Sequence, residues 1–369
     1  MTAPPPEATV YRLTHPFRIE AFDEPLAPPG PGWLLLRPLR VGICGSDLKL
    51  YTGTRERTAL MMKLPIALLH EGVAEVVAVG EGVPFSVGQH VVPSPNIPCT
   101  VAHPESHPNQ DEACYSCRPG GAGENYCMDG EFLSSNVDGM ARTAFLHPAR
   151  CTIPIPQGVS DSLAVLAEPF AAVLSGLEHA AASPGAALFL VLGNGTLGIL
   201  TAIALRAALG VEPHQVVMTG RHWDARASAV EGLATPADDD GGALGAELGG
   251  RFDVAFECAG GDSSGETLAL AIDMLRPGGR GVMFGPSEGP LLFDTRKMIA
   301  KGLSVVGCNR ALPRHFCEAL DFIAQPQVPG LFERALAPKE FTVGGTRDMD
   351  DALHYAWTKT DAGRAITLW

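Results

Sequence analysis

Short apolar runs alternate with glycine- and proline-containing turns through the first part of the sequence. The runs 32–38, 73–79 and 88–93 are bounded by such turns and contain β-branched or aromatic residues. This pattern predicts short strands. Residues 1–158 are therefore expected to form a β-rich domain.

From Ser160 onward the pattern changes to an alternation of helices and strands. An alanine-rich helical stretch begins there, and the continuous apolar run 187–192 follows it. A run without polar alternation is typical of a strand that is buried on both faces of a parallel sheet. Three further strands, a helix and a closing edge strand are then predicted at 216–219, 252–258, 281–285, 352–357 and 364–369.

Length and composition limit the possible classes of protein. A chain of 369 residues favours two domains, and 46% hydrophobic with 18% charged residues is typical of a globular protein. The net charge of -14 argues against nucleic acid or an anionic membrane surface as a partner. No apolar run reaches the ~18 residues of a membrane span. Because the N-terminus also lacks the features of a signal peptide, a cytoplasmic location is expected.

Residues of the types that bind zinc occur at intervals along the chain. Cys44, His70 and Glu168 are expected to be protein ligands of a catalytic zinc, with Glu71 as a fourth or exchanging ligand. The histidine and its neighbouring glutamate alone would predict only a turn before a strand. The whole set favours a metal that acts as a Lewis acid on a substrate hydroxyl.

Two polar residues follow Cys44 closely. Ser46 is near enough in sequence to hydrogen-bond the substrate alkoxide and pass its proton outward, or it only caps a turn. Asp47 is expected to be structural or to support a metal ligand from behind. The catalytic residues predicted from the sequence are thus Ser46 and Glu71.

A glycine-rich loop follows the strand expected at 187–192 and opens a helix predicted from Ile199 to Leu209. Glycines at this spacing let the backbone approach a pyrophosphate, which the helix N-terminus stabilises. About 20 residues further on, a glycine and an arginine replace the acidic residue that would bind a ribose 2′-hydroxyl. A cation there favours NADP over NAD, unless it is only a solvated loop residue. The expected cofactor-binding residues are Gly193, Asn194, Gly195, Thr196, Leu197, Gly198, Gly220 and Arg221.

A second cluster contains a CxxC core, Cys114 and Cys117, followed by Cys127. Four cysteines around such a core close a structural zinc site. The sequence therefore predicts two zinc ions per chain, one catalytic and one structural. The fourth ligand of the structural site is one of three upstream residues, Cys99, His103 or His107.

These motifs together resemble the zinc-dependent medium-chain alcohol and polyol dehydrogenases, in order and over nearly the whole chain. The resemblance implies a GroES-like catalytic domain, residues 1–158 and 311–369, and a Rossmann dinucleotide-binding domain, residues 159–310. It places the active site in the cleft between them. It also implies a nicotinamide cofactor and a homodimer or homotetramer.

Within that superfamily the sequence is similar to the bacterial ribitol-5-phosphate 2-dehydrogenases, which reduce ribulose 5-phosphate with NADPH. The chain departs from that family in its structural-zinc cysteines and in Gly45–Ser46. The resemblance implies a polyol or sugar-phosphate substrate. In a protein of net charge -14 its phosphate needs local cations, and these are expected to be Arg55, Lys63 and Arg310.

Three other functions account for parts of the pattern. A cyclitol or other polyol dehydrogenase of a biosynthetic pathway would use the same zinc and cofactor sites on an unphosphorylated substrate. A zinc-free quinone or enoyl reductase needs no metal, so the catalytic ligand set argues against it. A non-catalytic zinc-binding protein would explain the cysteine cluster but not the dinucleotide loop.

Overall fold

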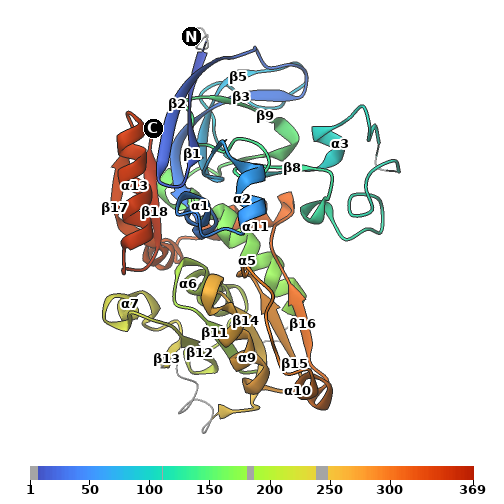
Figure 1. The fold of residues 1–369 in the computed structure, drawn as a ribbon, viewed down its shortest axis with the longest axis vertical. Coiled ribbons are helices and arrows are strands. Elements are labelled where there is room, and N and C mark those ends of the chain that lie inside the picture. The colour runs from blue at the N-terminus through green and yellow to red at the C-terminus, as the bar shows by residue number, and fades with distance from the viewer. Residues whose placement is uncertain (1–6, 110, 181–186, 238–247) are drawn as a thin grey trace.

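The computed structural model describes residues 7–109, 111–180, 187–237 and 248–369, which form a β-rich upper part and an α/β lower part (Figure 1). The first and the last strands of the chain both lie in the upper part. The middle of the chain, coloured green to orange, builds the lower part. None of the helices in the described ranges is long and apolar enough to cross a membrane.

A seven-stranded sheet forms the framework of the upper part, in the order β10-β6-β5-β3-β18-β17, with β9 also paired to β3. Its β18 lies inside the sheet, antiparallel to β3 and parallel to β17. The prediction of an edge strand at 364–369 is therefore wrong, because β17 covers its free side. The strands are β3 (Trp33–Ile43), β5 (Glu71–Val79), β6 (His90–Pro93), β9 (Phe145–Pro148), β10 (Thr152–Pro154), β17 (Leu336–Thr342) and β18 (Arg364–Leu368).

Two smaller sheets and several helices complete the upper part. A three-stranded antiparallel sheet has the order β2-β1-β4, and β7 pairs with β8. These strands are β1 (Glu7–His15), β2 (Arg18–Pro25), β4 (Ile66–Ala67), β7 (Asn96–Ile97) and β8 (Glu131–Phe132). The helices are α1 (Gly45–Tyr51), α2 (Arg57–Lys63), α3 (Cys99–Ala102), α13 (Thr346–Thr358) and the short 3-10 helices Glu124–Tyr126 and Ala149–Cys151.

The lower part is built on a six-stranded parallel sheet in the order β13-β12-β11-β14-β15-β16. Alternate residues of β11 belong to two different hydrophobic clusters, Phe189 and Val191 to one, Leu190 and Leu192 to the other. Its continuous apolar run is therefore buried on both faces, as predicted. The strands are β11 (Phe189–Leu192), β12 (Val216–Thr219), β13 (Thr235–Ala237), β14 (Phe252–Glu257), β15 (Leu275–Met283) and β16 (Ser304–Gly307).

Helices cover this sheet and join it to the upper part. The longest, α5, contacts β5 of the upper sheet and β15 of the lower one, and it runs between the two parts in Figure 1. The helix after β11 begins at Thr196, earlier than predicted, and continues as a π-helix to Ala208. The helices are α4 (Asp161–Ala164), α5 (Ala167–Ala180), α6 (Thr196–Ile203), α7 (Trp223–Val230), α9 (Ser264–Met274), α10 (Thr295–Lys301), α11 (Pro313–Ile323) and α12 (Pro329–Phe332). Short 3-10 helices span Pro213–Gln215, Gly261–Ser263 and Glu333–Ala335.

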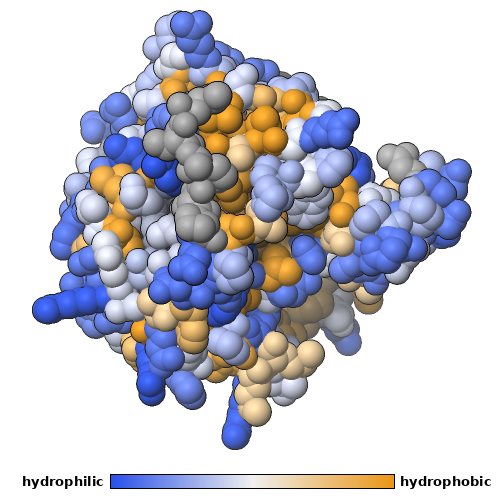
Figure 2. All heavy atoms as spheres, turned by 90° about the horizontal axis from the view of Figure 1, so that it is seen from above, coloured by the Kyte–Doolittle hydropathy of each residue, from blue (hydrophilic) through white to orange (hydrophobic). Residues whose placement is uncertain are grey.

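The segment 99–130, which includes α3, forms a lobe on one side of the upper part (Figure 1). Seen from above, the lobe projects from the molecule and its visible surface is mostly hydrophilic (Figure 2). Its buried cluster consists of Cys99, Cys117 and Cys127, with Ala113 and Cys114 packed against them. Within the described part of the lobe, the cysteines themselves are thus the core.

Candidate active site

A cavity of about 470 Å³ lies between the upper and lower parts. Its upper wall includes the start of α1 and the residues just before β5. Its lower wall is made by the loops that follow β11, β14 and β15. These loops leave the carboxyl ends of parallel strands where the strand order reverses, which is the usual ligand site of such a sheet.

Three residues with metal-binding side chains converge on the upper wall. The ligand atoms of Cys44, His70 and Glu71 all lie within 4.8 Å of one another. Cys44 is the N-cap of α1, and Glu71 is the first residue of β5. Leu69, immediately before the histidine, has φ of +72°. A leucine adopts this left-handed conformation only at a cost, and such strain is often found at functional sites.

The carboxylate of Asp47 is buried behind this cluster. Its Oδ1 accepts hydrogen bonds from Leu69 N (3.0 Å) and Ser134 Oγ (2.6 Å), and its Oδ2 accepts one from Cys44 N (3.0 Å). The same Oδ1 lies 3.4 Å from His70 Nδ1. Burial opposes ionisation, but His70 and these hydrogen bonds lower the pKa of Asp47. Asp47 is thus placed to orient two residues of the cluster.

Arg364 belongs to this site but could not be selected from the sequence. It lies on β18, and its Nε and Nη2 contact the carboxylate oxygens of Glu71 at 2.7 and 3.0 Å. The pair is buried. Gly42 makes room for it, because an added Cβ there would lie 3.0 Å from Arg364 and 3.1 Å from Glu71. The two partners are 293 residues apart, so no local pattern links them.

Glu168 and Ser46 line the same cavity. Glu168, in the first turn of α5, is close enough to Glu71 for the two charges to repel. It is not within the tight group formed by Cys44, His70 and Glu71 in the described chain. The Ser46 side chain is half-buried in the cavity wall. The structure therefore brings all five predicted residues to one cavity, with three of them in mutual contact range.

The ionisation of these groups suits a bound cation. Burial raises the pKa of Glu71 to about 8 and, together with the charge of Glu71, that of Glu168 to about 7. Burial also opposes ionisation of Cys44, but Arg364 and His70 outweigh it and lower its pKa to about 6. A thiolate beside reluctantly ionised carboxylates is compensated by a divalent ion. Sulfur, imidazole and carboxylate donors together fit zinc.

The glycine-rich loop opens the lower wall. Gly193 has φ of +115° and lies against the loop after β14, where an added Cβ would be 2.9 Å from Ala259 N. An added Cβ on Gly198 would lie 1.8 Å from Gly193 O, so this glycine lets α6 approach the loop. Gly195 faces open space and lines the cavity together with Thr196 and Leu197. The backbone at Gly195 is therefore free to meet a pyrophosphate.

Asn194 links this loop to the end of β12. Its side chain is buried, donates through Nδ2 to Arg221 O (2.7 Å) and accepts through Oδ1 from Arg226 Nη1 (2.9 Å). Gly220 makes room for it, since an added Cβ would lie 2.2 Å from Asn194 Cγ. Burial and the nearby charge of Arg221 lower the pKa of Arg226. Two arginines thus lie together at this strand end. Arg226 could not be selected from the sequence, because it lies on α7 and reaches the loop only through the fold of that helix.

The lobe gathers the second metal-binding set. The sulfur atoms of Cys99, Cys114, Cys117 and Cys127 lie within 4.8 Å of one another. Of the three alternatives for the fourth member, the structure brings Cys99 into the cluster. His107 instead contacts Glu112 O and lies 4.0 Å from Asp129. Four converging sulfurs fit a structural zinc site.

Two cations in the cavity lack a carboxylate partner within the described chain. Lys63 Nζ donates to Ser135 O (2.8 Å) and Ser135 Oγ (2.6 Å). Arg310 Nη1 donates to Asn96 Oδ1 (3.2 Å), and its guanidinium lies 4.5 Å from the centre of the Phe132 ring. Burial and the neighbouring cations Arg55 and Arg310 lower the pKa of Lys63. These side chains concentrate positive charge in one part of the cavity.

Arg55 lies in the same cavity but already has an anionic partner. Its Nη1 lies 3.1 Å from Glu288 Oε1, and Lys49 Nζ lies 2.8 Å from the same atom. Lys49 also donates to Pro286 O (2.7 Å). Because α1 and its loop belong to the upper part and residues 286–288 to the lower one, these contacts bridge the cavity.

Two family models match the chain. The model of the alcohol dehydrogenase GroES-like domain matches residues 30–157. The zinc-binding dehydrogenase model matches residues 197–325. Together they cover parts of both halves of the structure and both walls of the cavity.

Proteins of similar sequence are dehydrogenases and reductases. The ribulose-5-phosphate reductase 1 of Staphylococcus aureus is 29% identical over 341 residues, which are 91% of this chain and 92% of that protein. The glucose 1-dehydrogenase of Thermoproteus tenax is 33% identical over 322 residues, 82% of this chain and 83% of that protein. The crystal structure of S. aureus TarJ in complex with NADPH has the same fold, with a TM-score of 0.76 and 24% identity over 98% of this chain and 99% of that one. The α/β fold with a GroES-like and a Rossmann part, expected from the sequence, is confirmed.

The two cysteine sites predict different effects of serine substitutions. Cys117→Ser removes a ligand from a lobe whose core is its cysteines, so it should lose one zinc and markedly lower the melting temperature, because structural zinc contributes folding free energy. Cys44→Ser should lose the other zinc with a small change in melting temperature. Metal analysis and thermal unfolding of both variants check this. The opposite order of the two melting temperatures would contradict it.

The two loop glycines should also differ. Gly198→Ala forces a contact with Gly193 O and should destabilise the protein by about 1–3 kcal/mol, the usual cost of overpacking. Gly195→Ala meets open space and should unfold at the wild-type temperature, while both variants bind NADP more weakly in a calorimetric titration. Equal stability of the two variants would show that the loop does not pack as described.

Proposed function

Because the chain belongs to the zinc-dependent medium-chain dehydrogenase/reductase superfamily, we propose that it transfers a hydride between NADP(H) and the secondary alcohol or ketone of a phosphorylated polyol or ketose. The substrate pair we infer is ribitol 5-phosphate and ribulose 5-phosphate. One observation carries the proposal: a single cavity holds the metal-binding cluster, the dinucleotide loop and two cations that have no carboxylate partner in the described chain.

We assign the catalytic zinc to Cys44, His70 and Glu168, with Glu71 as a fourth or exchanging ligand. When bound, the zinc would supply a Lewis acid for the substrate oxygen. Two neighbouring residues position these ligands and stabilise their charge. Asp47 holds His70 and the backbone of Cys44 in place, and Arg364 compensates the buried charge of Glu71.

The proton of the substrate hydroxyl needs a route out of a buried site. Ser46 lines the cavity and follows Cys44 and Gly45 in the sequence. Its hydroxyl is thus the nearest in sequence to the cluster. We propose that it hydrogen-bonds the substrate oxygen and relays this proton towards the cavity mouth. The side chains of Phe132 and Phe284 line the same cavity and exclude water from the reacting carbon.

We assign the cofactor 2′-phosphate to Arg221 and Arg226. Both side chains carry positive charge at the end of β12, and burial together with repulsion by Arg221 lowers the pKa of Arg226, although the charge of Asp361 opposes this. No acidic side chain contacts them among the hydrogen bonds and ion pairs of the described residues. A dianionic 2′-phosphate would relieve this repulsion, whereas the uncharged ribose of NAD would not. TarJ, whose crystal structure contains NADPH, shares the fold.

We assign the substrate phosphate to Lys63 and Arg310, with Arg55 at the edge of the site. Among the described residues the first two contact neutral partners only, and their charge lies in the cavity that contains the metal-binding cluster. Arg55 must share or exchange its contact with Glu288 before it can bind an anion. The S. aureus relative named ribulose-5-phosphate reductase supports a phosphorylated ketose as the substrate.

The direct experiment compares ribulose 5-phosphate with ribulose as oxidants of NADPH, followed at the absorbance of the reduced nicotinamide. The kcat/KM for the phosphorylated ketose is expected to be at least about ten- to a hundredfold higher than for ribulose. This ratio corresponds to the contribution of one charge-assisted contact. Equal or better turnover of free ribulose, or of an unphosphorylated cyclitol, would overturn the phosphate assignment and leave a neutral polyol dehydrogenase.

Charge-removing variants rank the three substrate cations. Lys63→Met and Arg310→Met should each lower kcat/KM for ribulose 5-phosphate by about ten- to a hundredfold, with little change for ribulose. Arg55→Ala should have a smaller effect, because its charge is already compensated by Glu288. Arg296→Met, an exposed arginine on α10, is the matched control. Equal losses for both substrates would show that these cations are structural.

Cofactor choice tests the paired arginines. Arg226→Met should weaken NADPH binding about tenfold or more and leave NADH binding nearly unchanged, because only NADPH has the 2′-phosphate. Titration of the free enzyme with 2′,5′-ADP and with 5′-AMP separates this contact from catalysis. If wild-type protein bound both nucleotides equally, the NADP preference would be wrong.

A further inference from the structure

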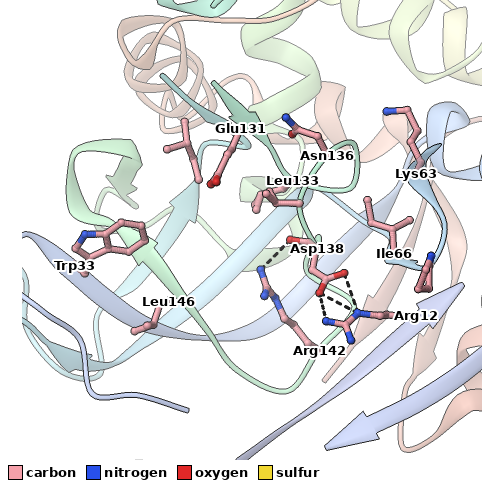
Figure 3. Close-up of a pocket in the computed structure, with 13 residues that line it drawn as sticks. Arg12, Trp33, Lys63, Ile66, Glu131, Leu133, Asn136, Asp138, Arg142 and Leu146 are labelled. Atoms are coloured by element: carbon pink, nitrogen blue, oxygen red, sulfur yellow. Dashed lines mark hydrogen bonds and ion pairs between the residues drawn. The ribbon is translucent and has the colours of Figure 1, made fainter. Parts of the chain in front are cut away.

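The upper part contains a second cavity, of about 520 Å³, which the proposed reaction does not use (Figure 3). It lies among β1, the start of β3, and the segment that follows β8. This volume is in the range of small-molecule sites, about 300–1,000 Å³. Lys63 lines both this cavity and the active-site cavity.

The segment 131–138 separates the two cavities. Phe132, Ser134 and Ser135 line the active-site cavity. Glu131, Leu133 and Asn136 line the second one. This segment, which turns at residues 134–136, therefore has a front that faces the active-site cavity and a back that faces the second cavity. Ser134 has φ of +65°, and its hydroxyl donates a hydrogen bond to Asp47. Because Asp47 in turn contacts His70, this segment is linked to the catalytic cluster through Asp47.

An arginine with unused donors lies in the second cavity. Arg142 Nη2 donates to Asp138 O (2.9 Å), and this is the side-chain hydrogen bond that it makes within the described chain. Its Nε is buried and has no partner there. Its guanidinium lies 4.7 Å from the centre of the Phe145 ring. Burial lowers the pKa of Arg142 to about 10, although Asp138 opposes this. The charge of this arginine is under-compensated.

The neighbouring carboxylate of Asp138 is already engaged. Figure 3 shows that Asp138 turns its carboxylate to Arg12, which also pairs with Glu24 at 2.6 Å. Asp138 Oδ1 accepts a further hydrogen bond from Ala67 N (2.8 Å). Within the described ranges, Arg142 therefore has only the backbone carbonyl of Asp138 as a hydrogen-bond acceptor.

The groups without a charged partner in this cavity are two cations, Arg142 and Lys63, and one carboxylate, Glu131, in the described chain. Arg12 is shared by two carboxylates, Asp138 and Glu24, so the local excess of positive charge is at most one unit, which suits a monoanion better than a dianion. The walls beside Arg142 are apolar and include Trp33, Ile97 and Leu146. A guanidinium next to such walls favours a carboxylate on an apolar body over inorganic phosphate.

We propose that this cavity is a second ligand site, which binds a small organic monocarboxylate with an aromatic or branched apolar body through Arg142. The bound carboxylate accepts hydrogen bonds from the free donors of Arg142, and its apolar body packs against Trp33 and Leu146. Because the ligand contacts the back of segment 131–138, its binding is coupled to the cavity on the other side through Ser134 and Asp47.

Benzoate is the probe, and Trp33 is the reporter, since its indole lines the cavity. Titration of the full-length protein with benzoate should give a saturable change in tryptophan fluorescence that is lost in Trp33→Phe, while calorimetry still detects binding to that variant. Benzyl alcohol, which has nearly the same body and no charge, should bind at least tenfold more weakly. Equal binding of the alcohol, or no saturable binding of benzoate, would overturn the proposal.

Two variants locate the site. Arg142→Met should weaken benzoate binding about tenfold or more, and Leu146→Trp should block it by filling the cavity without changing a charge. Arg296→Met should bind as the wild type does. Circular dichroism shows whether each variant is folded, and Leu146→Trp keeps the test decisive if the loss of Arg142 unfolds the protein. Wild-type binding by folded Leu146→Trp would place the benzoate elsewhere and overturn the proposal.

The coupling is tested separately and rests on the proposed dehydrogenase activity. Saturating benzoate should change kcat/KM for the reduction of ribulose 5-phosphate in the wild type and not in Leu146→Trp. Unchanged turnover in both proteins would remove the coupling. If benzoate binds as described and no dehydrogenase activity is found with any ketose, the proposed function fails and the ligand site stands.

Discussion

The buried contact between Glu71 and Arg364 is the interaction on which the active site depends. Five ionisable groups that can carry negative charge or bind a metal lie at one place inside the protein: Cys44, Asp47, His70, Glu71 and Glu168. A buried carboxylate without a counter-charge is costly, about 3–5 kcal/mol when the partner of a buried pair is removed. Arg364 supplies that charge, and its Nη1 also donates to Ile43 O (3.2 Å), next to Cys44.

This requirement explains why the chain returns to the upper sheet at its end. Arg364 is delivered by β18, which lies between β3 and β17. The strand that directly precedes Cys44, β3, is thereby paired with the strand that carries the arginine. Gly42, opposite Ile366, has no side chain to intrude on the ion pair. The upper sheet therefore contains strands that precede the lower part in the sequence and strands that follow it.

Local patterns in the sequence were sufficient for much of this account. The apolar run 187–192 and the glycines after it predicted a buried parallel strand and a dinucleotide loop, because both signals are contained within about ten residues. The spacing of Cys114 and Cys117 predicted a cluster of cysteines for the same reason. Arg364, Arg226 and the interior position of β18 could not be predicted, because each depends on contacts between distant segments. Cys99 could be separated from His103 and His107 only by the fold of the lobe.

We propose that the cluster around Cys44 and His70 holds a zinc ion distinct from the one in the lobe. The most direct measurement is anomalous diffraction from crystals of the purified protein, with data collected on both sides of the zinc absorption edge. Two zinc peaks per chain are expected, one among the four sulfurs of the lobe and one in contact with Cys44 and His70 in the cavity beside the dinucleotide loop. A single peak in the lobe, from crystals grown with excess zinc, would show that Cys44 and His70 do not form a zinc site.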